Sequence, residues 1–146
     1  MTVDEALGRF ARGLSAVTNI KSVPLRSARG RVLATDIAAP RSIPPHNNAA
    51  VDGYAVFFDD LNSNGETRLP VTDRIAAGHP LTRVARRGEA LQIFTGAPVP
   101  DGPDTIFMRE DCEVDDDDVV LPSGIRRGDN FRLAGEDIAS GAVALR

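Results

Sequence analysis

The character of the chain changes within residues 44–56, which read PPHNNAAVDGYAV. Two prolines make the start of this stretch rigid and force extended backbone before each of them. Polar residues follow, and the stretch then enters an apolar segment, Gly53 to Phe57, that predicts a β-strand. Asp52 lies at the junction of loop and strand, where the backbone fixes a side chain well. Gly53 beside it allows the close approach of a ligand or of another backbone.

The sequence before this junction predicts helical structure. Thr2 and Glu5 have the spacing of a capping box. Apolar residues then recur on one side of a helix that ends near residues 18–19. This stripe consists of Leu7, Phe10, Leu14 and Val17. A second, short helix is expected from Ser27 to Leu33 and a strand from Asp36 to Ala39.

The sequence after the junction predicts short strands separated by turns, at intervals typical of an antiparallel β lobe. In chain order these strands are Gly53 to Phe57, Leu69 to Ile75, Glu89 to Phe94, Thr105 to Met108, Asp118 to Leu121 and Ala142 to Leu145. The fold class expected is therefore α+β. An elongated helix-plus-strand lobe would comprise residues 1–45 and 134–146, and an inserted antiparallel β-rich lobe, β-barrel-like, would comprise residues 46–133.

Composition excludes several classes of protein. The 146 residues include one cysteine and two histidines, so an internal disulfide, a cysteine-based zinc site and a multi-histidine metal site are excluded. No run of about 18 apolar residues exists, and the first residues lack the order of a signal peptide. We therefore expect a cytoplasmic protein with no membrane partner. The net charge of −4 and the aromatic content of 5% disfavour nucleic acid as a partner.

Three loops carry polar residues that could do chemistry. In the first, Asp52 and Asn48 could bind a ligand or could only hydrogen-bond their own turn. The second begins at Thr95, whose hydroxyl and neighbouring backbone N–H groups could meet an anion, unless the loop is a plain hairpin connection. In the third, Glu136 and Asp137 could bind a hard cation such as Mg²⁺, and Asp137 could equally cap a helix or turn.

Taken together, these stretches resemble the N-terminal part of molybdopterin molybdenumtransferase, the family that includes bacterial MoeA and the C-terminal domain of gephyrin. Each matching piece is short, but together they follow the family's order over nearly the whole chain. The pieces lie at residues 24–25, 30–34, 39–40, 44–45, 48, 52–56, 75–78, 95–102, 110–111 and 135–138.

The resemblance implies an enzyme that inserts molybdenum from molybdate into adenylylated molybdopterin and releases AMP, with Mg²⁺ or a similar ion involved. Asp52, Thr95 and Asp137 match positions in the family's cleft. Asp52 and Asp137 would hold the metal or orient the oxygens of molybdate, and Thr95 would donate a hydrogen bond. The substrate-binding residues implied are Asn48, Gly53, Gly96, Ala97, Pro98 and Glu136. The cleft lies between two subunits of a homodimer, and one side of it is a large α/β nucleotide-fold domain that this chain lacks. We therefore expect the chain alone to be inactive.

Some residues depart from the family pattern. Asn47 and Ala49 stand where the family usually has Asp and Ser, and Arg109 stands where it commonly has Gln. Contacts to a metal or an oxyanion at residues 47 and 49 are therefore expected to be weaker or different. Three alternatives to part of an enzyme remain open: a non-catalytic dimerisation or scaffold module, which the changed loop favours, a short paralogue of the family with another task, and a small module that binds an anion.

Overall fold

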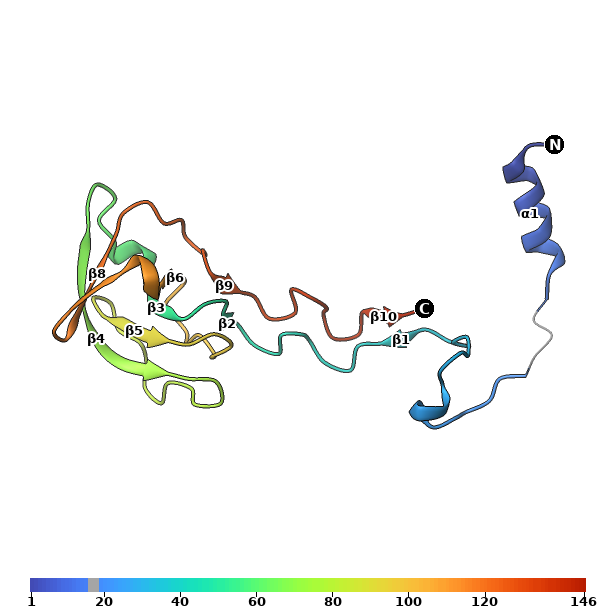
Figure 1. Cartoon of the computed structure of the whole chain (residues 1–146), viewed down its shortest axis with the longest axis horizontal. Coiled ribbons are helices and arrows are strands. Elements are labelled where there is room, and N and C mark those ends of the chain that lie inside the picture. Colours follow the sequence, from blue (N-terminus) through green and yellow to red (C-terminus); the bar gives the residue numbers. More distant parts are fainter. Residues whose placement is uncertain (16–18) are drawn as a thin grey trace. The chain divides into compact units, whose positions relative to one another are not determined.

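The computed structural model describes residues 1–15 and 19–146 (Figure 1). These residues divide into two compact units, one of residues 1–36 with Arg146 and one of residues 37–145. The division expected from the sequence, residues 1–45 with 134–146 against residues 46–133, stays a prediction. Within the described residues, no helix is both long enough and apolar enough to cross a membrane.

Helix α1 (Val3–Gly13) begins as the sequence predicts. The Thr2 hydroxyl accepts a hydrogen bond from the Glu5 N–H at 3.2 Å, and the Glu5 carboxylate accepts one from the Thr2 N–H at 2.8 Å. These two bonds complete the capping box and satisfy two N–H groups that the first turn leaves free.

The helical part of the first unit is shorter than predicted. Helix α1 ends at Gly13, because Leu14 is already extended and glycine is a poor helix former. Val17, which was assigned to the apolar stripe, lies outside the described residues. The predicted helix from Ser27 to Leu33 is wrong. Only one 3₁₀ turn, η1 (Leu25–Ser27), forms there, and Gly30 takes a φ of +78° that cannot continue a helix.

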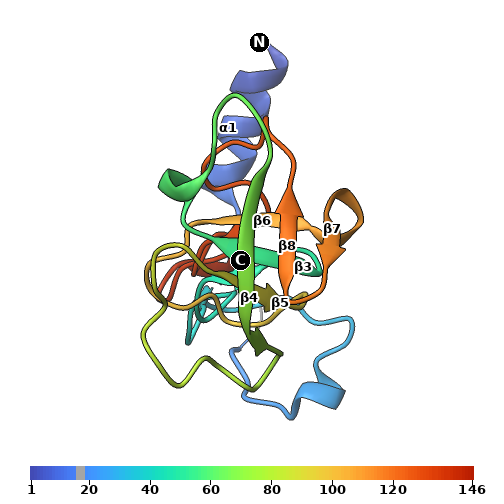
Figure 2. The ribbon, with the colours of Figure 1, turned by 90° about the vertical axis from the view of Figure 1, so that its left-hand side faces the viewer.

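Six strands of the second unit form one sheet that curls on itself (Figures 1 and 2). Its strand order is β6-β3-β5-β4-β8-β7. The strands are β3 (Gly53–Val56), β4 (Thr67–Ile75), β5 (Ala90–Ile93), β6 (Thr105–Met108), β7 (Glu113–Asp115) and β8 (Asp118–Leu121). Neighbours are antiparallel except β4 and β5, which are parallel, so the expected antiparallel lobe is corrected to a mixed sheet. Residues 76–89 between them are long enough for the crossover that a parallel pair requires.

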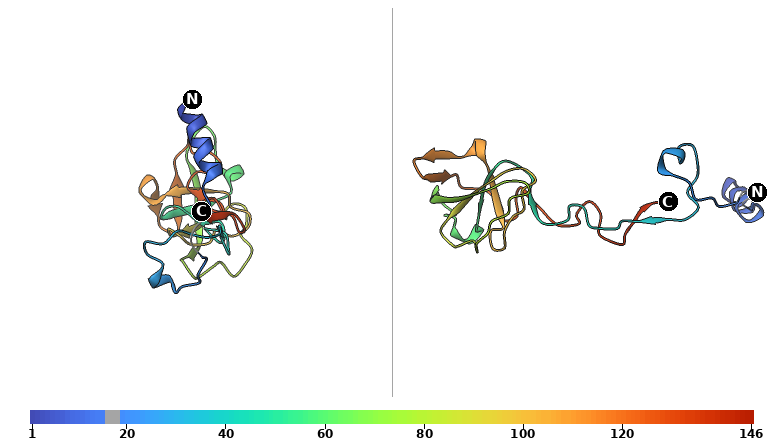
Figure 3. Two further views of the ribbon diagram at one scale, coloured as in Figure 1. Left: turned by 90° about the vertical axis from the view of Figure 1, so that its right-hand side faces the viewer. Right: turned by 90° about the horizontal axis from the view of Figure 1, so that it is seen from below.

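Outside the sheet, residues 37–49 and 131–145 run side by side in opposite directions (Figures 1 and 3). Strand β1 (Ile37–Ala38) pairs with β10 (Val143–Leu145), and β2 (Asn48–Ala49) pairs with β9 (Phe131–Arg132). The sequence does not reveal β2 and β9, because two residues are too few to show an alternating pattern. Two 3₁₀ turns complete the described elements, η2 (Phe58–Asp60) and η3 (Arg109–Asp111).

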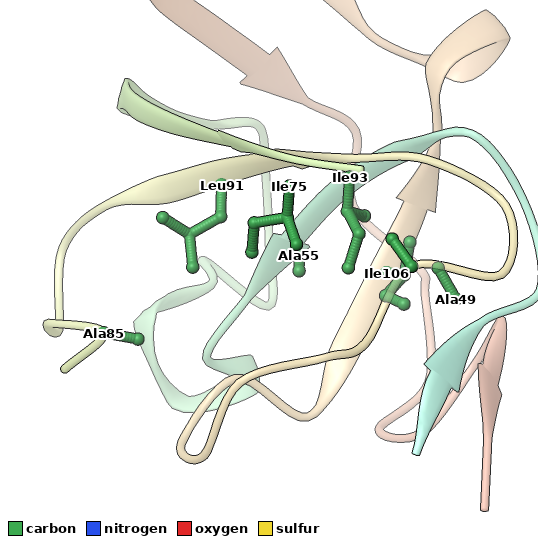
Figure 4. Close-up of a cluster of buried hydrophobic side chains, with 8 residues drawn as sticks. Ala49, Ala55, Ile75, Ala85, Leu91, Ile93 and Ile106 are labelled. Carbon is green, nitrogen blue, oxygen red and sulfur yellow. The ribbon is translucent and has the colours of Figure 1, made fainter. Parts of the chain in front are cut away.

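The core of the second unit lies on both faces of β3. Tyr54 and Val56 belong to one buried cluster and Ala55 to the other, as the alternation of side chains along a strand requires. Figure 4 shows most of the cluster that contains Ala55, made almost entirely of aliphatic side chains. Because β3 is buried along its whole length, the position of Asp52 just before it is firmly set.

Candidate functional site

Asp52 and Thr95 form the best-defined pair among the predicted site residues. Asp52 Oδ1 accepts two hydrogen bonds from Thr95, one from the hydroxyl at 2.6 Å and one from the backbone N–H at 2.8 Å. Asp52 precedes β3 and Thr95 follows β5, and these strands pair so that Gly53 lies opposite Ile93. The sheet therefore brings together two residues that are 43 positions apart in the sequence.

The carboxyl group of Asp52 is exposed and ionised. The Thr95 hydroxyl and then the Thr95 backbone N–H lower the pKa of Asp52 below its ordinary value. Burial opposes these two hydrogen bonds less strongly, and the positive charge of Arg109 makes the smallest contribution, which also lowers the pKa. Arg109 also fixes the backbone here, because its N–H donates to the Asp52 carbonyl oxygen at 3.0 Å. The Thr95 hydroxyl donates its hydrogen bond to Asp52, so in this arrangement it cannot donate to a substrate.

Gly53 has a structural reason to be glycine. A Cβ at this position would collide with the Phe107 carbonyl oxygen of the neighbouring β6 and lie 2.8 Å from its carbonyl carbon. The predicted close approach of another backbone is therefore confirmed. The role in substrate binding that the resemblance gave to Gly53 stays a prediction.

The loop that follows Thr95 is attached to β2. The Gly96 N–H donates to the Ala49 carbonyl oxygen at 2.8 Å, and the Ala49 N–H donates to the Ala97 carbonyl oxygen at 3.0 Å. Pro98 forms a β-bridge with Asn48. Gly96 has a φ of +77°, a conformation that favours glycine. Ala97 is fully buried, so its side chain contributes to packing.

The altered residue Asn47 connects the first and third predicted loops. Its side-chain oxygen accepts a hydrogen bond from the Ala134 N–H at 2.9 Å. Next to it, Asn48 is opposite Arg132 in the β2–β9 pair. The sequence analysis expected Asn47 to weaken contacts to a metal or oxyanion, whereas the structure gives this amide a partner within the chain.

Glu136 and Asp137 both bind one arginine. Arg132 Nε donates to Glu136 Oε1 at 2.6 Å, and an Arg132 terminal nitrogen donates to Asp137 Oδ1 at 2.7 Å. The Leu133 N–H donates to the other Glu136 oxygen at 2.9 Å. Hydrogen bonding from Arg132, followed by that from Leu133, lowers the pKa of Glu136.

A metal ion between Asp52 and Asp137 fits these residues poorly. Thr95 occupies one oxygen of Asp52, and Arg132 occupies one oxygen of Asp137. Among residues 1–15 and 19–146, no group of three or more His, Cys, Asp and Glu side chains is arranged to hold a metal ion. We therefore assign no chemical step to a cation held by this chain, and the metal roles of Asp52 and Asp137 remain untested predictions.

The structure thus groups the predicted residues in two places. Asp52, Thr95 and the residue 96–98 loop meet around the start of β3, and Glu136 and Asp137 gather around Arg132. The chain segment at residues 47–49 is hydrogen-bonded to both places. Sequence reasoning gave Arg132 no role, because a spacing of four residues from Glu136 predicts an ion pair only on a helix, whereas this segment is β9 followed by a turn.

Comparison with known proteins places this fold in a defined class. The molybdopterin biosynthesis moeA protein from Pyrococcus horikoshii OT3 has a similar structure, with a TM-score of 0.79 and 35% sequence identity. The similarity covers 86% of this chain and 34% of that protein. The fold is therefore that of part of a moeA protein.

The sequence family is the MoeA N-terminal region (domain I and II), which matches residues 1–146, and the chain belongs to this family. Molybdopterin molybdenumtransferase of Haemophilus influenzae is 32% identical over 99% of this chain and 36% of its own length. Molybdopterin molybdenumtransferase 2 of Mycobacterium tuberculosis is 37% identical over 85% of this chain and 31% of its own length. The chain therefore spans about a third of the length of these relatives.

Proposed function

We propose that this chain is the N-terminal part of an enzyme that inserts molybdenum from molybdate into adenylylated molybdopterin, with release of AMP. The observation that carries the proposal is the hydrogen-bonded pair of Asp52 and Thr95, in a chain that matches the MoeA N-terminal region from end to end. The names of its relatives support the reaction class, molybdopterin molybdenumtransferase.

In this proposal Asp52 orients a protonated group of the substrates. An ionised carboxylate accepts hydrogen bonds and repels an oxyanion such as molybdate. Thr95 holds Asp52 Oδ1, and no hydrogen-bond donor among the described residues reaches Oδ2. That oxygen is therefore suited to accept a hydrogen bond from a hydroxyl or thiol group. Thr95 is a positioning residue, because it fixes the carboxylate and lowers its pKa.

The rest of the cleft would come from outside this chain. Relatives have about twice as much additional sequence as this chain covers, and the resemblance assigns a large α/β nucleotide-fold domain to that part. The proposal includes a homodimer, in which the elongated lobe of residues 1–45 and 134–146 contributes to subunit contacts. It also includes a cytoplasmic location and predicts no turnover by the 146-residue chain alone.

The proposal is tested in the full-length protein, or by adding the remaining part of the protein to this chain. Molybdenum bound to molybdopterin and AMP released are measured for Asp52→Asn, Thr95→Val and Thr95→Ser. Loss of the Asp52 carboxylate is expected to slow turnover about 100-fold, the scale of removing one positioned hydrogen-bonding group from an active site. Thr95→Ser should stay close to the unmodified protein, since it keeps the hydroxyl.

The matched control is Asp36→Asn, which removes an exposed carboxylate in the first unit. It should change the rate less than twofold, since surface substitutions away from special features have small effects. A normal rate with Asp52→Asn would end the assignment of Asp52. Absence of any molybdenum insertion by the unmodified full-length protein would end the proposal.

A second candidate, a dimerisation or scaffold module, is favoured by the surface of α1. Its apolar residues Leu7 and Phe10 are 60% and 66% exposed, and Leu14, which follows the helix, is 77% exposed. A second copy of the chain could cover such a stripe by helix packing. Light scattering should then give the mass of a dimer, and Phe10→Asp should return it to the monomer. A monomer mass at all concentrations would count against this candidate.

A further inference from the structure

The third predicted loop is organised by a single side chain. Arg132 is the last residue of β9, and its guanidinium donates to the carboxylates of both Glu136 and Asp137, at 2.6 and 2.7 Å. Two neighbouring ionised carboxylates repel each other. The planar guanidinium, with its fork of donors, compensates for both charges and fixes their directions.

The backbone holds the same arrangement from the other side. The Leu133 N–H donates to Glu136 Oε2 at 2.9 Å, so both oxygens of Glu136 have donors. The Asp137 N–H donates to the Ile43 carbonyl oxygen at 3.0 Å. Gly135 turns the chain with a φ of +77°, which brings residues 136 and 137 back towards Arg132.

A divalent cation has little opportunity to bind these two carboxylates. Mg²⁺ requires near-octahedral oxygen coordination and gives up its water reluctantly. Here three of the four carboxylate oxygens already accept hydrogen bonds, and the described residues supply no third metal-binding side chain. A metal ion would have to displace the guanidinium, which is part of the same loop and always charged.

We infer that the Arg132 guanidinium, and not a divalent cation, neutralises and orients Glu136 and Asp137 in this chain. Arg132 is a positioning residue. The inference rests on the proposed function only in placing these carboxylates at a substrate cleft. It opposes the metal role that the resemblance gave to Asp137.

Hydrogen exchange of the Leu133 amide tests the inference, because this amide donates to the Glu136 carboxylate that Arg132 holds. In the unmodified 146-residue chain, the exchange rate should be the same with millimolar MgCl₂ and with EDTA. Arg132→Gln should raise the rate about fivefold, the upper range for an exposed ion pair. Arg132→Lys, which keeps a positive charge, should raise it less.

Two results would overturn the inference. One is exchange at Leu133 that slows with MgCl₂ or quickens with EDTA in the unmodified chain. The other is an Arg132→Gln variant that exchanges at the unmodified rate. The buried amide of Leu91 in β5 serves as the control for global unfolding. If the Leu91 amide also exchanges faster in Arg132→Gln, this variant is destabilised as a whole, and Arg132→Lys decides the test. The exchange rate of Leu133 in Arg132→Lys must then lie between the rates in the unmodified chain and in Arg132→Gln.

This experiment also separates the inference from the proposed function. Hydrogen exchange requires no turnover, so a full-length protein that fails to insert molybdenum would end the proposed function and leave the exchange result standing. Protection of Leu133 that depends on Mg²⁺ would end the inference and leave the proposed function standing.

Discussion

Replacing Glu89 by Gln should weaken the crossover between the two parallel strands. The Glu89 side chain is only 8% exposed. It accepts hydrogen bonds from the Arg83 guanidinium at 2.7 Å, the Thr72 hydroxyl at 2.7 Å and the Arg86 N–H at 2.8 Å. Thr72 lies on β4, Arg83 and Arg86 lie in the crossover, and Glu89 directly precedes β5. One carboxylate therefore holds all three segments together.

The size of the effect follows from the pKa of Glu89. Burial alone would raise this pKa, but hydrogen bonds from Arg83, Arg86 and Thr72, with the charge of Arg83, lower it from 4.5 to about 2. The difference corresponds to about 3 kcal/mol of folding free energy. Because the folded chain binds the proton less tightly, this stabilisation is complete above about pH 4.5 and is lost as the pH falls through about 2.

The assay is urea denaturation of the unmodified chain and of Glu89→Gln, followed by circular dichroism. At neutral pH the variant should be less stable by about 2 to 3 kcal/mol, because it leaves Arg83 without its buried partner. At about pH 3 the difference should fall to about half. At this pH Glu89 is protonated in the unfolded chain but still mostly ionised in the folded chain, so proton binding lowers the free energy of unfolding of the unmodified chain.

The matched control is Glu66→Gln, which removes an exposed carboxylate just before β4. It should change the free energy of unfolding by less than about 0.5 kcal/mol at either pH. A stability difference between Glu89→Gln and the unmodified chain that is the same at neutral pH and at about pH 3 would refute the reasoning.

Three further changes test the packing and electrostatics of the site. Gly53→Ala should lower the free energy of unfolding, measured by urea denaturation, by more than about 3 kcal/mol. The control Gly13→Ala places a carbon with nothing within 4 Å of it and should leave the stability unchanged or raise it. Equal effects of the two substitutions would contradict the close approach of β3 and β6. Thr95→Val should raise the pKa of Asp52 towards its ordinary value in a carboxyl NMR titration, and an unchanged pKa would show that the hydroxyl does not matter. Asn47→Ala should lower the free energy of unfolding by about 1 kcal/mol, and Asn47→Asp should lower it less, because it keeps the acceptor oxygen. A larger loss of stability in Asn47→Asp than in Asn47→Ala would exclude the hydrogen bond to residue 134.

Much of the local structure was predictable from the sequence. The capping box at Thr2 and Glu5 is confirmed, and so are the strands at residues 105–108 and 118–121 with their predicted bounds. These features depend on neighbouring residues, through a cap or an alternating pattern. The predicted helix at residues 27–33 failed because Gly30 adopts a left-handed conformation that no periodicity reveals.

The site was predictable as a set of residues but not as an arrangement. The resemblance selected Asp52 and Thr95, and the structure joins them by two hydrogen bonds. It also gives the Thr95 hydroxyl to Asp52 rather than leaving it free for a substrate. Arg132 had no role in the prediction, because its importance depends on the return of the chain at Gly135, which brings two carboxylates to one guanidinium.

The sequence by itself determined the start of α1, most strands of the six-stranded sheet and which loops are rich in polar groups, because such preferences arise within a few residues. Only the tertiary structure decided that β4 and β5 are parallel, that Asp52 meets Thr95, and that one arginine binds the carboxylates of both Glu136 and Asp137. Strand order and hydrogen bonds across 43 residues depend on which apolar faces are buried together, and that choice is made by the whole chain at once.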